Sequence, residues 1–202
     1  MIDARLLPVI KTVLQPPARA LAGLGVSADS VTLMGFGFGL IAVFAVSLGW
    51  MKTALVFLLL NRLCDGLDGT IARLSTPTDR GAFLDIALDF VFYALFPLGF
   101  ALLDPTSNAL AAAVLIAAFV GTGSSFLAFA TISAKRGETA AAFPSKGIYY
   151  LGGLTEGAET IALFVVMCLL PEWFAPLAYG FALACAVTTV LRWLQGWRSF
   201  GP

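Results

Sequence analysis

Long apolar runs separated by short polar breaks occupy most of this 202-residue sequence. Hydrophobic residues make up 59% of the chain and charged residues only 12%, whereas soluble domains are roughly half apolar and about one quarter charged. A membrane-spanning helix needs about 20 apolar residues, so the chain has room for about six spans with short connections. We therefore expect an all-α polytopic membrane protein with a single membrane domain.

Turn signals divide the apolar sequence into six predicted transmembrane helices. Ser27 or Asp29-Ser30 offers a helix cap before the first span, and Asp104-Pro105 and Pro171-Glu172 are typical of tight turns. The helix that contains Pro97 can continue past it with a kink. The predicted spans cover about residues 31–49, 53–74, 80–103, 108–134, 154–170 and 174–194. They form one predicted domain, 27–202, in which residues 135–153 are the only long connection.

Residues 1–26 precede the first span and differ from the rest of the chain. Apolar positions alternate there with Arg5, Lys11 and Arg19, and Pro16-Pro17 interrupts them. We interpret this segment as an amphipathic helix that lies at the membrane interface. A cleaved signal peptide is the alternative, but Asp3, the double proline and the distance to the first long apolar run argue against it.

The global charge excludes some classes of partner and some chemistry. The net charge is zero and there is no basic tail, so we expect no nucleic acid partner. The chain has no histidine, which excludes histidine ligands and leaves carboxylates as the only plausible base. Cys64, Cys168 and Cys185 lack the CxxC spacing, so we interpret them as small buried residues.

Lysine and arginine residues predict the orientation in the membrane. Lys52 falls on one side of the predicted topology, and ten other basic residues fall on the opposite side. The positive-inside rule then places both termini in the cytoplasm. We expect a protein of the bacterial inner (plasma) membrane whose candidate site, described next, faces the cytosol.

Four aspartates stand in the apolar sequence around the turn between the second and third spans. Asp65 and Asp68 are three residues apart, and Asp85 and Asp89 are four apart, so each pair lies on one face of its helix. Carboxylates at membrane depth are costly unless they are paired, hydrated or bound to metal. Hard oxygen donors without His or Cys select Mg²⁺, Mn²⁺ or Ca²⁺, and two such ions can clamp a phosphoryl group. We predict a phosphate ester or pyrophosphate substrate.

Other residues near the four aspartates have two interpretations each. Gly69 and Gly81 lower the stability of a helix. They allow either a ligand to approach the backbone or two helices to pack closely. Arg73 and Arg80 serve either to neutralise phosphate or to anchor the helices at the interface. Asp79 is interpreted as a hydrated loop residue.

The whole segment resembles the signature of the CDP-alcohol phosphotransferase family, Asp-x-x-Asp-Gly-x-x-Ala-Arg, a spacer of usually eight residues, and Gly-x-x-x-Asp-x-x-x-Asp. The spacer here, residues 74–80, has seven residues. The resemblance extends to the six-helix plan, the amphipathic N-terminal segment and the start of the first span, where relatives often carry Ser-Pro-Asn. The matching positions are Asp65, Asp68, Gly69, Ala72, Arg73, Gly81, Asp85 and Asp89.

The resemblance implies a phospholipid-synthesis enzyme that transfers a phosphoalcohol group from a CDP-linked donor to an acceptor hydroxyl and releases CMP. It implies that Asp65, Asp68 and Asp85 bind two divalent cations, Mg²⁺ or Mn²⁺, and that Asp89 is the general base and also contacts metal. Gly69, Ala72 and Arg73 would line the CDP site together with Gly81. The family is commonly homodimeric.

The acceptor is not encoded by the signature. Lys135, Arg136 and Lys146 could bind an anionic acceptor or could serve only as positive-inside anchors. Glu156 and Glu159 enter the fifth span, so we hypothesise an acceptor-side role for them, or pairing with Arg62 or Lys146.

Several functions remain open at this point. The leading one is transfer from CDP-diacylglycerol to a small alcohol, and the second is transfer from a soluble CDP-alcohol to a lipid acceptor. A cation transporter is a third, but its path would need polar groups distributed through the bilayer, and these acids cluster at one turn. A structural membrane scaffold would leave the acids unexplained.

Overall fold

A computed structural model describes residues 2–137 and 154–201, with side chains from residue 13 onwards. Within these residues the protein is helical and has no β-strand. The elements are α1 (Ile2–Gly23), α2 (Ala28–Ser47), α3 (Met51–Leu74), α4 (Asp79–Leu103), α5 (Pro105–Lys135), α6 (Gly157–Leu169), the 3₁₀-helix η2 (Pro171–Trp173) and α7 (Phe174–Ser199).

The helices follow the predicted spans closely, and the predicted turns lie between them. Ser27 is the N-cap of α2, where its side chain accepts a hydrogen bond from the Ser30 backbone N–H. Asp104 caps α5 in the same way by accepting from Ser107, and these bonds hold the pKa of its carboxyl below the usual value. α4 continues through Pro97, as predicted.

The N-terminal helix differs from the prediction in one respect. We expected Pro16-Pro17 to interrupt the amphipathic segment, but α1 continues through both prolines to Gly23. The missing N–H groups remove hydrogen bonds without ending the helix. Leu14 and Ala18 on α1 are buried against α3, so packing stabilises this helix.

Four segments are long and apolar enough to cross a membrane: α2, α4, α5 and the continuous η2–α7 segment. α3 has 24 residues but carries five charged ones, and α6 has 13 residues, about 20 Å at 1.5 Å per residue. A bilayer core is about 30 Å thick. The described residues therefore give four candidate spans, and the predicted count of six is not confirmed.

The outer surface is apolar, as expected of a protein embedded in lipid. Phe44, Val120 and Leu183 are each more than 60% exposed although they lie within long helices. An apolar surface of this extent is typical of contact with a membrane. Cys64, Cys168 and Cys185 are free thiols and all buried, as predicted.

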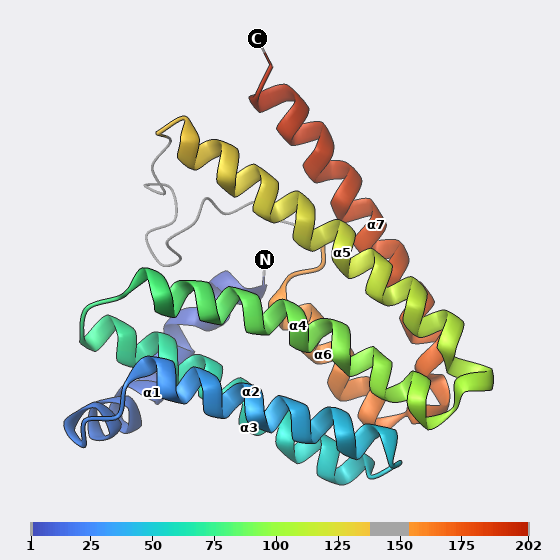
Figure 1. The fold of residues 1–202 in the computed structure, drawn as a ribbon, viewed down its shortest axis with the longest axis horizontal. Coiled ribbons are helices and arrows are strands. Elements are labelled where there is room, and N and C mark those ends of the chain that lie inside the picture. Colours follow the sequence, from blue (N-terminus) through green and yellow to red (C-terminus); the bar gives the residue numbers. More distant parts are fainter. Residues whose placement is uncertain (1, 138–153, 202) are drawn as a thin grey trace.

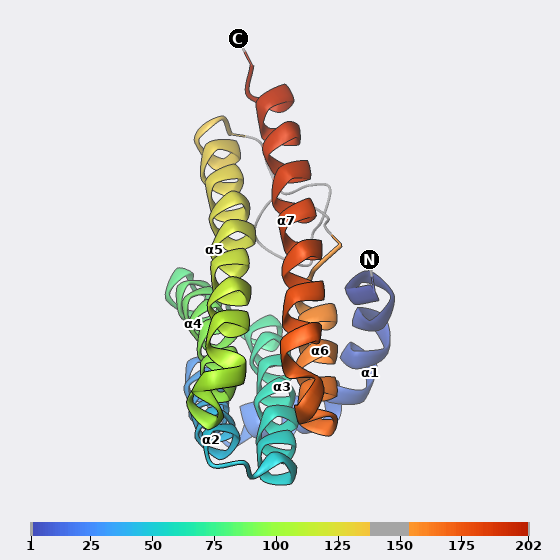
Figure 2. The same cartoon turned by 90° about the vertical axis from the view of Figure 1, so that its right-hand side faces the viewer.

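α4 and α5 meet at a sharp corner, with α2 beside α4 and α7 beside α5 (Figure 1). α2 packs on both α3 and α4, and α5 packs on α4 and α7. Figure 2 shows α5 beside α7, and α1 near α3 and α6. The α3–α4 pair is not among the closely packed pairs of the described residues, because α2 is the helix that contacts both. The space between α3 and α4 is where the candidate site lies.

The core is aromatic and is centred on the second half of α4. Phe96 stacks on Phe164 of α6 with ring centroids 4.3 Å apart, and Phe100 stacks on Phe174 with centroids 4.4 Å apart. All four rings are fully buried. This cluster joins α4, α6 and the start of α7 at the end of the bundle away from the four aspartates.

Two glycines let neighbouring helices approach α4 closely. A Cβ atom on Gly39 of α2 would lie 2.8 Å from Phe92 Cδ2, and one on Gly123 of α5 would lie 2.7 Å from Phe90 Cε1. Neither distance is possible without moving the ring. α4 is therefore held on two sides by ring–glycine contacts.

Candidate active site

The four motif aspartates come from two helices that face each other across a narrow crevice. Asp65 and Asp68 lie on α3, and Asp85 and Asp89 lie on the first half of α4. Asp68 is buried, Asp65 and Asp89 are half-buried, and Asp85 is exposed. The polar residues that line the crevice are Thr32, Asn61, Arg62, Asp65, Asp68, Asp85 and Asp89.

Three of the four carboxylates converge. One oxygen from each of Asp65, Asp85 and Asp89 lies within 4.8 Å of the other two. Donors spaced in this way can share one cation, and all are hard oxygens of the kind that Mg²⁺ and Mn²⁺ prefer. The donor set therefore fits a divalent metal, as the sequence predicted.

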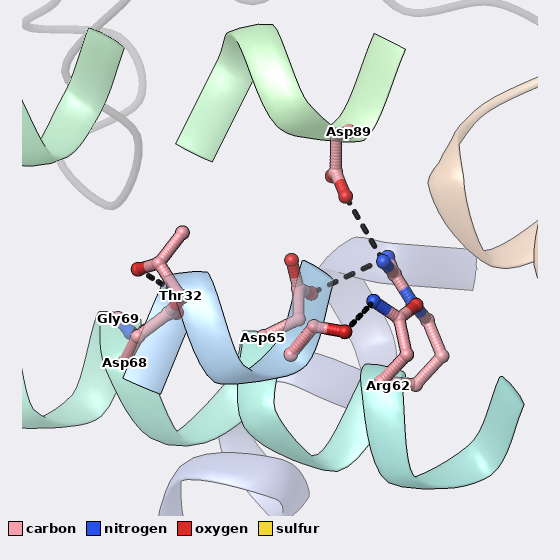
Figure 3. A network of polar contacts seen from close by, with 8 residues as sticks. Thr32, Arg62, Asp65, Asp68, Gly69 and Asp89 are labelled. Atoms are coloured by element: carbon pink, nitrogen blue, oxygen red, sulfur yellow. Dashed lines mark hydrogen bonds and ion pairs between the residues drawn. The ribbon is translucent and has the colours of Figure 1, made fainter. Parts of the chain in front are cut away.

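Asp68 is held apart from these three. Its Oδ2 accepts a hydrogen bond of 2.6 Å from Thr32 Oγ1 of α2, and its Oδ1 accepts one of 2.5 Å from the Gly69 backbone N–H. Thr32 thus orients this carboxylate from the neighbouring helix, as Figure 3 shows. The sequence predicted that all four acids bind metal, and the described geometry brings together Asp65, Asp85 and Asp89 only.

An arginine lies among the acids (Figure 3). Arg62 Nη2 donates to Asp89 Oδ1 at 2.9 Å, and Nη1 lies 3.7 Å from Asp65 Oδ2. Its Nε donates to Asn61 Oδ1 at 2.8 Å, and Asn61 Nδ2 donates to the Gly35 carbonyl oxygen at 2.9 Å. A continuous set of hydrogen bonds therefore links the backbone of α2 to Asp89 on α4.

The residues predicted to bind the nucleotide lie at the C-terminal end of α3 and the N-terminal end of α4. Arg73 is exposed, and its Nη2 donates to Thr70 Oγ1 at 3.1 Å. A Cβ on Gly69 would lie 3.4 Å from Arg73 Nη1, so this glycine leaves room beside the guanidinium. Ala72 is half-buried on the last turns of α3.

Gly81 lies at the first turn of α4 beside an ion pair. Arg80 donates from Nε to Asp29 Oδ2 at 2.7 Å, and a Cβ on Gly81 would lie 3.0 Å from Asp29 Oδ1. The seven-residue spacer thus places Arg80 on Asp29 at the start of α2. This contact favours the anchoring interpretation of Arg80. Asp79 is exposed, as predicted, but it is the first residue of α4 and not part of the loop.

The acids at the start of α6 have a structural explanation. Glu156 and Glu159 form a capping box, in which Glu159 Oε2 accepts from the Glu156 backbone N–H at 3.2 Å. Arg62, one expected partner, pairs with Asp89 and Asp65 instead. Lys146, the other, lies outside the described residues. An acceptor-side role for the two glutamates stays a prediction.

The basic residues at the end of α5 tie two helices together. Arg136 donates from Nη1 to the Ser199 carbonyl oxygen at 3.0 Å and from Nη2 to that of Phe200 at 3.1 Å. Lys135 is exposed in the last turn of α5. The Arg136 contacts hold the ends of α5 and α7 together, and the acceptor-binding and positive-inside interpretations both stay predictions.

Sequence reasoning missed Thr32, Asn61 and the pairing of Arg62. A signal for Arg62 was present, because an arginine three residues before Asp65 in an apolar run requires a partner. Thr32 and Asn61 are common polar residues whose roles depend on contacts between helices. Nothing in their spacing distinguishes them from other polar residues.

A family model described as CDP-alcohol phosphatidyltransferase matches residues 26–194. The chain belongs to the CDP-alcohol phosphatidyltransferase family. It is therefore an enzyme of the phosphotransferase type, and the transporter and scaffold alternatives are set aside. The match begins after the amphipathic helix and extends through most of α7.

Two relatives match over most of their length. Inner membrane protein YnjF of Escherichia coli (strain K12) is 52% identical over 197 residues, which cover 98% of this chain and 96% of that protein. An uncharacterized protein of Aquifex aeolicus (strain VF5) is 31% identical over 165 residues, 79% of this chain and 76% of its own.

Solved structures share the fold. Mycobacterium tuberculosis phosphatidylinositol phosphate synthase (PgsA1) with CDP-DAG bound has a TM-score of 0.66 and 22% identity, covering 92% of this chain and 94% of that one. The same protein in complex with manganese and citrate also has a TM-score of 0.66 and 22% identity, covering 91% and 88%. At this identity the likeness shows the fold.

Proposed function

We propose that this enzyme transfers a phosphatidyl group from CDP-diacylglycerol to the hydroxyl of an alcohol acceptor and releases CMP. The observation that carries the proposal is the convergence of Asp65, Asp85 and Asp89 within 4.8 Å inside the complete family signature. PgsA1, which shares the fold, has been solved with CDP-DAG bound, and this supports a lipid-linked donor here.

Asp89 is the proposed general base. The acceptor oxygen forms a bond to the phosphorus that carries the diacylglycerol, the bond from that phosphorus to the bridging oxygen of CMP breaks, and the acceptor proton passes to the carboxylate. Asp89 suits this task because it is half-buried at the crevice and a carboxylate within hydrogen-bond reach can accept such a proton. With no histidine in the chain, the aspartates of the crevice are the bases available there.

The proposed metal ligands are Asp65, Asp68, Asp85 and Asp89, which would hold two divalent cations, Mg²⁺ or Mn²⁺. Bound divalent ions would offset negative charge on the pyrophosphate. The three converging carboxylates fit such an ion, and PgsA1 has been solved in complex with manganese. Thr32 supports the site by fixing the orientation of Asp68.

The nucleotide would lie over Gly69, Ala72, Arg73 and Gly81. Gly69 has no side chain to block approach to the backbone of α3, and the exposed Arg73 guanidinium lies beside it. A permanent positive charge at this position suits a diphosphate. The acids on one side and the arginine on the other would then bracket the pyrophosphate.

The proposed location is the cytoplasmic face of a bacterial inner membrane. The name of the YnjF relative supports the inner membrane, and the excess of basic residues on one side supports a cytoplasmic site and cytoplasmic termini. α3 and α6 would complete six spans, and the protein would act as a homodimer. A lipid donor and a water-soluble acceptor meet only at such an interface.

CMP release from membranes that contain the enzyme tests the proposal. CDP-diacylglycerol is supplied with a panel of alcohols, neutral, cationic and anionic, in the presence of Mg²⁺ or Mn²⁺ and then with a chelator. We expect CMP with at least one alcohol and none after chelation. CMP formation only with a soluble CDP-alcohol and a diacylglycerol acceptor would reverse donor and acceptor. Absence of metal-dependent CMP with every pair would refute the proposal.

A further inference from the structure

Arg62 is a cation placed inside the acid cluster rather than at its entrance. It lies three residues before Asp65 on α3, one turn further from the α3–α4 connection. Its side chain is only 16% exposed. A charge in such a position is costly unless it is fully paired, so its contacts need an explanation.

The contacts of Arg62 form a brace between three helices. Asn61 is anchored to the Gly35 carbonyl of α2 and accepts from Arg62 Nε, and Arg62 Nη2 then donates to Asp89 of α4. A guanidinium is planar, so fixing Nε also fixes the direction of Nη2. The brace therefore determines where Asp89 Oδ1 lies.

Two aromatic rings limit the movement of the guanidinium. Its central carbon lies 5.4 Å from the centroid of the Phe92 ring and 5.9 Å from that of Tyr93. A cation over aromatic faces at these distances is attracted to them. Since the rings follow Asp89 on the same helix, the arginine is held against α4 by charge and by packing.

The charge of Arg62 acts on the same carboxylates that converge. The guanidinium contacts Asp89 and lies 3.7 Å from Asp65, and these are two of the three acids whose oxygens meet. Arginine stays protonated in proteins. Its positive charge therefore opposes a second cation at these acids under all ordinary conditions.

We propose that Arg62 is a positioning residue that fixes Asp89 for the reaction and, as a resident counter-charge, weakens divalent-metal binding to the acid cluster. The inference rests on the proposed function, because it assigns Arg62 a role toward the metal site and the base of that reaction. We therefore expect loss of Arg62 to tighten metal binding while turnover falls. A merely structural residue would not move the two quantities in opposite directions.

The test measures Mn²⁺ binding to the purified full-length protein by the EPR signal of free Mn²⁺, without substrate. We expect Arg62→Gln to bind Mn²⁺ about tenfold more tightly than the wild type, because one nearby positive charge is removed. At saturating Mn²⁺, its kcat for CMP release should fall by about 100-fold, the scale of a misplaced catalytic group.

Arg62→Lys separates charge from geometry. It retains the positive charge, so its Mn²⁺ affinity should stay within about threefold of the wild type, but a single ammonium cannot bridge Asn61 and Asp89 as the fork does. The kcat of Arg62→Lys should therefore be about as low as that of Arg62→Gln. Lys52→Gln, at the other end of α3, is the matched control for loss of one charge and should change neither quantity.

Unchanged or weaker Mn²⁺ binding in Arg62→Gln, with a wild-type gel-filtration profile and unfolding midpoint, would overturn the counter-charge role. A wild-type kcat in Arg62→Lys would overturn the positioning role. If Arg62→Gln does not fold, Arg62→Met, which also removes the charge, takes its place in the Mn²⁺ titration. Failure of the proposed function is distinguishable, because then the wild type itself releases no CMP while its Mn²⁺ binding is still measurable.

Discussion

One face of α4 changes character halfway along the helix. In its first half this face presents Asp85 and Asp89, and in its second half it presents Phe92, Phe96 and Phe100, at spacings of three and four residues that keep them aligned. The aromatic half is stabilised by direct stacking on α6 and η2–α7. The acidic half depends on partners from α3, above all Arg62.

Stability and chemistry are separable along this helix. The second half of α4 is held by ring packing and by a hydrogen bond from Asn108 Nδ2 to the Phe100 carbonyl oxygen, so its stability does not depend on the acids. Conversely, the acids repel one another and need counter-charges before they can lie within 4.8 Å. Changes in the acidic half should lower activity, and changes in the aromatic half should lower the free energy of unfolding.

The largest expected effect is on activity, from Asp89→Asn. The amide keeps the shape but cannot take the acceptor proton, so CMP release should fall by about 10³-fold or more. The unfolding midpoint in detergent should change far less than in the aromatic variant below. If Asp89→Asn keeps more than a tenth of wild-type turnover, Asp89 is not the base.

Phe96→Ala should have the largest effect on stability. The ring is fully buried and stacks on Phe164, so its removal leaves a cavity and should cost about 3–5 kcal/mol of unfolding free energy. Thermal unfolding followed by size-exclusion chromatography measures this. Phe96→Leu is the control and should cost less, whereas equal loss in Asp89→Asn would contradict the division of the helix.

Thr32→Val should lower activity moderately. It removes the 2.6 Å hydrogen bond to Asp68 while keeping the shape of the side chain, and a bond to a charged group contributes about 1.5–3 kcal/mol. We expect a rate of CMP release roughly tenfold lower and a raised Mn²⁺ requirement. Thr32→Ser keeps the hydroxyl and should retain most activity; similar losses in both variants would point to packing instead.

The smallest effect concerns an acid outside the site. Hydrogen bonds from Ser107 lower the pKa of Asp104, so its stabilising effect is complete above the usual carboxyl pKa of about 3.9 and is lost as the pH falls through the lower folded value. Asp104→Asn should flatten that acid limb of the unfolding midpoint and leave CMP release unchanged. A loss of turnover would extend the functional region to the corner between α4 and α5.

Much of the fold followed from the sequence, because apolar length, caps and prolines are local signals. Ser27 caps a helix in the structure as predicted, and Pro105 and Pro171, which were predicted to lie in turns, are the first residues of α5 and η2. The four aspartates were evident because charge in an apolar run requires a reason. Local signals did not reveal that α1 continues through Pro16-Pro17.

What could not be predicted are the contacts between helices. The pairing of Thr32 with Asp68 joins residues 36 apart, and that of Arg62 with Asp89 joins residues 27 apart. Their geometry depends on how α2 packs against both neighbours. A spacing rule cannot supply that information, because many polar residues satisfy the same rule.

The ring–glycine contacts on α4 have a consequence for recognising active members of this family from sequence. Phe90 and Phe92 flank Asp89, and each lies against a glycine of another helix, Gly123 or Gly39. The rotation of α4 about its axis therefore depends on the absence of a side chain at Gly39 and Gly123, two positions that lie outside the signature. A homologue with all eight signature residues but a bulky residue at either position would pass a motif search while the aspartate equivalent to Asp89 points elsewhere.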